Sequence, residues 1–196
     1  MNFLAHIYLS GNNHELMIGN FIADMLRGKQ IYEYEKGILD GITLHKLIDE
    51  YTDDHDIVKE CVEIIRPSQG RYATVVVDIM FDHFLAKNWD DYHVESLDAY
   101  ANYVYQTMES NYAILPDKFQ LMLPKMKSEN WLSQYQYMEG MQKAFEGMSR
   151  RTSFKSNMAV AADDLQENYD ELEDRFKFFF NDVITLVEEN GVKIIK

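Results

Sequence analysis

Acidic and histidine side chains recur in pairs, four residues apart, within segments that are otherwise apolar. The stretch Val75–Trp89 reads VVVDIMFDHFLAKNW and places Asp78, Asp82 and His83 inside an apolar run of helix length. On a helix, residues four apart lie on one face, so Asp78 and Asp82 would stack one turn above the other. Two carboxylates on a buried face need a cation, because an unpaired buried charge is costly.

The same spacing occurs in three further apolar segments. These pairs are Asn2 with His6, Asn20 with Asp24, and His45 with Asp49. An isolated Asp-His pair could instead end a buried strand or satisfy a nearby backbone group, and for Asp82 and His83 this alternative stays open. Four pairs together suggest that their side chains meet in one polar centre.

Length and composition indicate one soluble domain. With 196 residues the chain is long enough to bury about 70% of its unfolded surface, so we predict a single domain over residues 1–196. Hydrophobic residues make up 46%, yet no run approaches the roughly 18 apolar residues of a membrane helix. The first residues lack the basic leading region of a signal peptide. We therefore expect a cytoplasmic protein without a membrane partner.

The charge of the chain limits its partners. A net charge of -14 argues against a general nucleic-acid binder, because phosphate contacts need a positive surface. The single cysteine, Cys61, excludes an intramolecular disulfide and a zinc site built from several cysteines. An anionic partner would have to meet a local basic patch, and two candidates exist. They are Arg150 and Arg151 with Lys155, and Arg27 with Lys29. The first cluster could equally pair with Asp163 and Asp164 on the surface.

The pattern of breakers and apolar residues predicts an all-α, single-domain helical bundle. Only three prolines and nine glycines interrupt the chain, which favours long helices over many short strands. The β-branched run from Thr74 to Val77 would also suit a strand, but the apolar run that contains it exceeds strand length. The expected helices are Leu16–Arg27, Gly37–Tyr51, about 54–66, Arg71–Trp89, Tyr92–Tyr112, Asp117–Lys127, Trp131–Met148, and a last one from Ala161 to Val187.

Five segments spread over most of the chain resemble the acyl carrier protein phosphodiesterase family. They are MNFLAHIYLS at the N-terminus, GNFIADMLRG at 19–28, GITLHKLIDEYTD at 41–53, DIMFDHFLAKNW at 78–89 and GMSRR at 147–151. This family is similar to a divergent branch of the HD-type metal-dependent phosphohydrolases, which have an all-helical fold. The adjacent pair here is Asp82 then His83, the reverse of the usual His-Asp order.

The resemblance implies an activity and a set of site residues. The activity is metal-dependent hydrolysis of the phosphodiester that joins 4′-phosphopantetheine to a serine of holo-acyl carrier protein, with Mn²⁺ or Mg²⁺ as the metal. By the matching motifs, the metal candidates are His6, Asp24, His45, Asp82 and His83, and the catalytic candidates are Asp24, Asp49 and Asp78. We assign Arg27, Arg150 and Arg151 to substrate binding, since arginine forks suit phosphate oxygens.

Two alternatives stay open at this stage. A related hydrolase could act on a nucleotide or another small phosphodiester, and would then have a closed pocket without a basic rim for a protein. A non-catalytic helical bundle for metal storage or sensing would favour His-x-x-x-Glu pairs, and none of the six histidines has a glutamate four residues on. Carrier proteins are acidic, so the phosphodiesterase hypothesis requires the basic residues to gather on one face. The oligomeric state is not predicted.

Overall fold

A computed structural model describes residues 1–194, except for the side chains of Lys29 and Tyr32. All regular elements in these residues are helical and none is a strand, which confirms the predicted all-α class. The α-helices are α1 (Phe3–Tyr8), α2 (His14–Ile22), α3 (Lys36–Asp54), α4 (Asp56–Gln69), α5 (Ala73–Lys87), α6 (Leu97–Ser110), α7 (Asp117–Ser128), α8 (Trp131–Gln134), α9 (Met138–Ser149), α10 (Ala161–Glu167) and α11 (Tyr169–Glu189). Short 3₁₀ turns are η1 (Ala23–Met25), η2 (Gly28–Glu33), η3 (Gly70–Tyr72), η4 (Trp89–Asp91), η5 (Tyr112–Ile114) and η6 (Met158–Val160).

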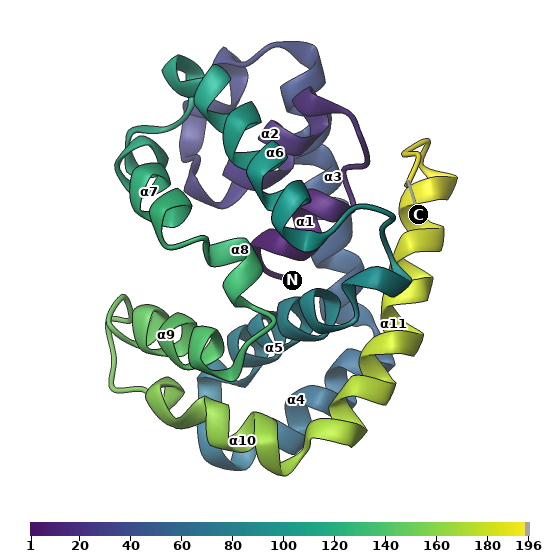
Figure 1. Cartoon of the computed structure of the whole chain (residues 1–196), viewed down its shortest axis with the longest axis vertical. Coiled ribbons are helices and arrows are strands. Elements are labelled where there is room, and N and C mark those ends of the chain that lie inside the picture. Colours follow the sequence, from purple (N-terminus) through teal and green to yellow (C-terminus); the bar gives the residue numbers. More distant parts are fainter. Residues whose placement is uncertain (195–196) are drawn as a thin grey trace.

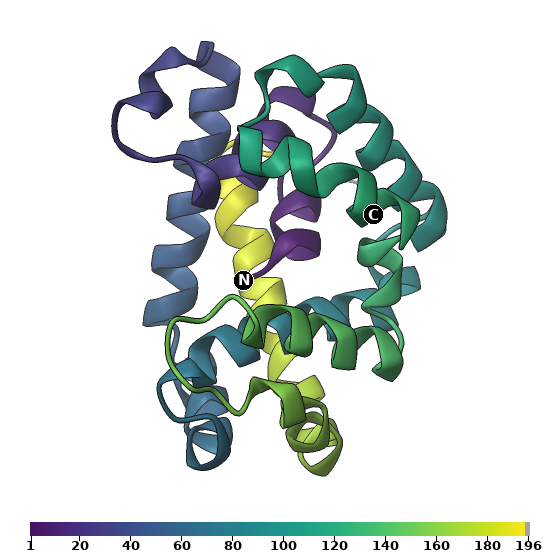
Figure 2. The same cartoon turned by 90° about the vertical axis from the view of Figure 1, so that its left-hand side faces the viewer.

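Helix α5 is the central element of the core. From Val76 to Ala86 every residue except Asp78 is buried, and the helix contacts α1, α4, α9 and α11. The long helix α11 runs along one side of the molecule, while the short helix α1 lies in its middle, close to α3 (Figures 1 and 2). Within the described residues, no helix is both long and apolar enough to cross a membrane.

Two predicted helices are each divided into two. The segment Trp131–Met148 breaks after Gln134, and α9 starts at Met138 with its axis turned away from α8. A side chain on Gly140 would overlap the backbone carbonyl of Gln134, so only glycine permits this close crossing. The sequence predicted one helix here because its apolar spacing continues across the break. Trp131 and Leu132 before the break pack against the same core as Met141 after it.

The last predicted helix breaks at Asn168. There the side-chain amide of Asn168 donates a hydrogen bond to the backbone carbonyl of Asp164, which ends α10. Helix α11 then begins at Tyr169. Because Leu165 and Tyr169 are four residues apart on the two sides of the break, spacing alone predicted one continuous helix.

Helices α2 and α3 are in direct backbone contact, which positions the polar side chains described below. A side chain on Gly19 would overlap the carbonyl oxygen of Ile38, and one on Gly41 would overlap that of Leu16. Only glycine lets the two helices approach so closely. This contact places Asn20, the residue after Gly19, against His45, which lies one turn after Gly41.

Candidate metal centre

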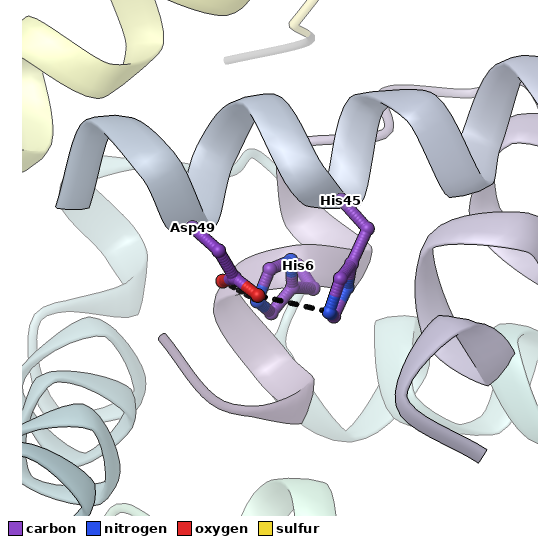
Figure 3. Close-up of side chains that lie close together, drawn as sticks. All are labelled: His6, His45 and Asp49. Atoms are coloured by element: carbon purple, nitrogen blue, oxygen red, sulfur yellow. Dashed lines mark ion pairs between the residues drawn. The ribbon is translucent and has the colours of Figure 1, made fainter. Parts of the chain in front are cut away.

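Three side chains from two helices converge on one point. His6 comes from α1, while His45 and Asp49 lie one turn apart on α3 and point toward it (Figure 3). The Nε2 atom of His6 lies 3.1 Å from Oδ1 of Asp49, and that of His45 lies 3.0 Å from Oδ2. One nitrogen or oxygen from each residue falls within 4.8 Å of the others. Two imidazoles and a carboxylate form a donor set for a divalent cation.

Asn20 on α2 fixes the orientation of both imidazole rings. The Nδ1 atom of His6 lies 2.8 Å from Oδ1 of Asn20, and Nδ1 of His45 lies 2.8 Å from the Asn20 backbone oxygen. Carbonyl oxygens only accept hydrogen bonds, so both Nδ1 atoms carry the proton and donate. Because Nδ1 is used in this way, Nε2, on the side of Asp49, is the nitrogen of each ring that can bind a metal once it carries no proton. Hydrogen bonds of this kind orient the histidine ligands of metal sites.

Asn20 is itself held in place. Its side-chain nitrogen donates to the backbone oxygen of His6, at 2.7 Å, and to Oγ of Ser10, at 2.9 Å. Ser10 in turn donates to the same His6 oxygen, at 2.9 Å. Sequence reasoning paired Asn20 with Asp24 but gave neither Asn20 nor Ser10 a role. The available signal was a buried asparagine within an apolar helix.

An unfilled hydrogen-bonding position supports a bound cation. The Nε2 atom of His6 is buried and has no hydrogen-bond partner among the described residues, although Oδ1 of Asp49 lies 3.1 Å away. Buried polar atoms without a partner are uncommon in folded proteins. A divalent cation between these groups would take up this lone pair. The residues present therefore fit the metal ion that the sequence predicted.

The surroundings shift the pKa values of His6, His45 and Asp49 in different directions. Burial lowers the pKa of His6, so this ring is neutral and can act as a ligand. Burial also disfavours a charged His45, but hydrogen bonds to Asp24 and Asp49 outweigh it and raise the pKa of His45 to about 9. Burial opposes ionisation of Asp49, yet the hydrogen bond from His45 and the nearby amino group of Met1 lower its pKa. The carboxylate of Asp49 is therefore ionised.

Two further predicted carboxylates adjoin this group. Asp24, on η1, has Oδ1 3.1 Å from Nε2 of His45, and its side chain is 79% exposed. The hydrogen bond with His45 lowers the pKa of Asp24. Asp78, on α5, has Oδ1 3.1 Å from the amino group of Met1, which lies 3.7 Å from Oδ1 of Asp49. Both Asp24 and Asp78 thus lie next to the three converging side chains, Asp24 toward solvent.

The structure does not bring the carboxylate of Asp82 into the group. Its Oδ2 accepts a hydrogen bond from the backbone N–H of Leu4, at 2.8 Å, and its Oδ1 from that of Ala5, at 3.0 Å. Asp82 therefore caps the first turn of α1 from α5, satisfying N–H groups that have no partner within the helix. This is the backbone role that the sequence left open. Burial, opposed by these two hydrogen bonds, raises the pKa of Asp82 to about 7.

His83 also points away from the group. Its Nδ1 donates to the backbone oxygen of Tyr135, at 2.7 Å, and its Nε2 accepts from the hydroxyl of Tyr169, at 2.9 Å. Both ring nitrogens are thus used in joining α5 to α11 and to the segment between α8 and α9. Burial lowers the pKa of His83, consistent with a neutral ring. In the structure, protein groups already occupy the polar atoms of these two predicted ligands, Asp82 and His83.

The three predicted substrate-binding arginines lie in two places. Arg150 and Arg151 follow α9 and line a groove between α7, α8 and α9. Arg27 is an exposed residue just before η2, three residues after Asp24, and does not line this groove.

Sequence comparisons match the chain to one protein family. Residues 1–183 match the family described as acyl carrier protein phosphodiesterase. The chain is 34% identical to a protein of that name from Klebsiella pneumoniae (strain 342), over 96% of this chain and 98% of that protein. It is also 34% identical to one from Enterobacter sp. (strain 638) and 32% identical to one from Salmonella agona (strain SL483), each over 92% of this chain and 94% of the relative. No solved structure gives a significant match.

Proposed function

The chain belongs to the acyl carrier protein phosphodiesterase family, and we propose that His6, His45 and Asp49 form the centre where it hydrolyses holo-acyl carrier protein. The bond cleaved is the phosphodiester between 4′-phosphopantetheine and the carrier's serine, and the products are the apo-protein and free phosphopantetheine. One observation carries this assignment. Two histidine Nε2 atoms face one carboxylate, while Asn20 holds both Nδ1 atoms.

We assign Mn²⁺, or Mg²⁺, to this centre, with His6, His45 and Asp49 as its protein ligands. When bound, such an ion lowers the pKa of a water and neutralises charge on the phosphoryl oxygens. Asn20 keeps both rings in the tautomer that ligation needs. Asp49, with its lowered pKa, supplies the negative charge that balances the cation. The carboxylate of Asp49 and bound waters are ligands that suit these hard cations, and the group of three contains no cysteine.

Asp24 is the residue we assign to proton transfer. It is ionised, largely exposed and in contact with His45, so a substrate and a water can reach it from solvent. Its carboxylate accepts a proton from the attacking water. A new phosphorus–oxygen bond forms as the bond to the serine oxygen breaks, and that oxygen takes up a proton to become the serine hydroxyl. Asp78, beside Asp49 and Met1, orients the water by accepting its second hydrogen bond.

The arginines are assigned to the anionic part of the substrate. Arg150 and Arg151 donate hydrogen bonds to phosphoryl oxygens or to carboxylates around the carrier's serine. Arg27 lies outside the groove that contains Arg150 and Arg151, three residues after Asp24, and we assign it to the same substrate. We also propose that the fold is a divergent HD-type arrangement. Its histidine and aspartate ligands come from one helical turn of α3, in place of an adjacent His-Asp pair.

A direct assay tests the proposed function. Purified protein is incubated with holo-acyl carrier protein and Mn²⁺, and mass spectrometry follows the carrier. We expect the carrier to lose the mass of phosphopantetheine, and expect excess chelator to stop this loss. His55→Ala is a matched control, because His55 is a histidine that pairs with Asp182 away from the centre. Loss of the group that continues unchanged in chelator, or no loss with Mn²⁺ or Mg²⁺, would contradict the proposal.

A further inference from the structure

A groove with apolar walls lies beside the candidate centre. It encloses about 570 Å³ between α7, α8 and α9, a volume typical of sites that take a ligand or a partner's side chains. The large apolar side chains that line it include those of Phe3, Ile79, Leu121, Met122, Trp131 and Met148. Leu121 is 83% exposed at the edge of this groove and would be available to a partner that binds there.

Basic side chains surround this groove. Lys125 from α7 and Lys143 from α9 line it together with Arg150 and Arg151. Two of these cations have partners: Lys125 lies 3.7 Å from Glu129, which also lines the groove, and Arg150 lies 3.7 Å from Glu146. Sequence reasoning missed the two lysines, because they are 18 residues apart in the chain and belong to no cluster. Within the described part of the chain, neither Lys143 nor Arg151 is within ion-pair distance of a carboxylate. In a protein with net charge -14, these cations form a local attraction for an anionic partner.

Arg151 is held against the apolar wall. Its guanidinium carbon lies 6.0 Å from the centre of the Trp131 ring, and one of its nitrogens lies 3.9 Å from the sulfur of Met122. A guanidinium at this distance is weakly attracted to the face of the ring, and its N–H groups can still donate to a partner. The groove therefore presents charge and apolar surface side by side. This combination suits a protein surface better than it suits a fully ionic ligand such as a polyphosphate.

The groove adjoins the candidate centre. Asn2 and Ile79 line the groove, and they follow directly after Met1 and Asp78, whose amino and carboxylate groups lie 3.1 Å apart beside Asp49. The Asn2 side chain also donates to the hydroxyl of Tyr135, another groove residue, at 2.9 Å. A partner seated in the groove would thus hold its neighbouring groups close to the centre.

We propose that this groove is the docking surface for the acidic face of the carrier protein next to its modified serine. The inference rests on the proposed function and adds to it the place of contact. Lys125, Lys143 and Arg151 pair with carboxylates of the carrier, and an apolar side chain of the carrier packs between Met122 and Trp131. Helical partners commonly bind apolar grooves in this way. The groove also resolves the mismatch between two acidic proteins, since the attraction is local.

A pair of charge-matched variants tests the proposal. Lys125→Glu with Lys143→Glu reverses charge inside the groove. Lys118→Glu with Lys193→Glu makes the same change in net charge at exposed lysines outside it. Both Mn²⁺-loaded variants are assayed with holo-acyl carrier protein and with bis(4-nitrophenyl) phosphate. The measured quantity is the ratio of kcat/KM for the carrier to kcat/KM for the small diester. We expect this ratio to fall at least about tenfold in the groove variant, mainly because KM for the carrier rises.

The control variant should change this ratio by less than about twofold, because exposed charges outside the contact are screened by salt. An equal fall in both variants would show that only overall charge matters, and would overturn the docking site. Equal losses for the carrier and the small diester in the groove variant would assign the groove to the phosphate itself, and would also overturn it.

A binding measurement separates this proposal from the proposed function. Trp131 lines the groove, whereas Trp89, the other tryptophan, is buried. Apo-acyl carrier protein lacks the phosphodiester, so it can bind only through its surface. We expect it to change the tryptophan emission of the wild type in a saturable way, and to leave that of Trp131→Phe unchanged. If holo-carrier is not cleaved but this signal is present, the function fails and the docking site stands. If cleavage occurs without this signal, the docking site fails.

Discussion

Two buried polar regions of this protein contain the same residue types but differ in how their polar atoms are bonded. In the centre formed by His6, His45 and Asp49, the protein satisfies one nitrogen of each ring and leaves the other facing a shared point. At Asp82 and His83, protein groups occupy both carboxylate oxygens and both ring nitrogens. The comparison teaches that burial and residue type do not identify a ligand. What separates the two regions is that Nε2 of His6 has no hydrogen-bond partner, whereas every polar atom of Asp82 and His83 has one.

The first way to break this comparison is to remove the carboxylate of the centre. Asp49→Asn keeps the shape of the side chain but loses the charge that faces His6 and His45. We expect kcat/KM for holo-acyl carrier protein to fall by more than about 100-fold, since even residues that only orient metal ligands cost about 10–100-fold. Circular dichroism should show an unchanged helical signal. Glu50→Gln, an exposed neighbour on α3, is the matched control.

The second test weakens the orientation of the rings without touching the ligands. Asn20→Ala removes the side-chain oxygen that accepts from His6 and His45. We expect Mn²⁺ affinity, measured by calorimetry, to fall about 10–100-fold. Ser10→Ala is the control, because Ser10 contacts Asn20 but neither ring. Equal affinity in Asn20→Ala and the wild type would show that the rings need no such support.

The third test addresses the other region. Asp82→Ala leaves the N–H groups of Leu4 and Ala5 without their acceptor. We expect the free energy of unfolding at pH 5 to fall by about 2–3 kcal/mol, the usual cost of stranding buried polar groups. Affinity for Mn²⁺ should stay within about threefold of the wild type in the folded variant. A variant that unfolds normally but no longer binds Mn²⁺ would make Asp82 part of the metal site.

The pH dependence of stability sharpens the same test. Burial raises the pKa of Asp82 to about 7, against an ordinary value of 3.8. The folded protein therefore keeps a proton that the unfolded chain releases as the pH rises from about 4 to about 7. The contribution of Asp82 to the free energy of unfolding is therefore fully present below pH 4 and is lost as the pH rises from about 4 to about 7. Asp82→Asn cannot titrate, so urea denaturation should show it gaining stability relative to the wild type as the pH rises from 5 to 7.5.

The smallest expected effect is at His83. Glutamine at this position can reach only one of the two partners, Tyr135 or Tyr169. We expect His83→Gln to lower the free energy of unfolding by about 1 kcal/mol, the net contribution of one hydrogen bond. Thermal denaturation measures this loss, and Mn²⁺ affinity should not change. A large loss of Mn²⁺ affinity at unchanged stability would restore His83 as a ligand.

The sequence predicted much of the fold and part of the site, for identifiable reasons. Helical spacing is a local property, so His45 and Asp49 were correctly expected on one helix face. Helix α5 was predicted despite its β-branched start, because its apolar run is longer than a strand. The breaks at Gln134 and Asn168 were missed, since apolar spacing continues across both.

The partners of buried atoms were beyond what spacing can reveal. The backbone N–H groups that occupy Asp82 are 77 and 78 residues away in the chain, and nothing near Asp82 marks them. The same holds for Asn20, whose role depends on the glycine contact between α2 and α3. Lys125 and Lys143 likewise join the arginines only in three dimensions.

The most direct test of the central claim is to locate the metal. Crystals of the protein grown with Mn²⁺ can be measured at a wavelength where manganese scatters anomalously, and the anomalous difference map marks the ion. We predict one strong peak between Nε2 of His6, Nε2 of His45 and the carboxylate of Asp49, with Asp82 still bonded to Leu4 and Ala5. A peak bound by Asp82 or His83, with no density among His6, His45 and Asp49, would contradict the account.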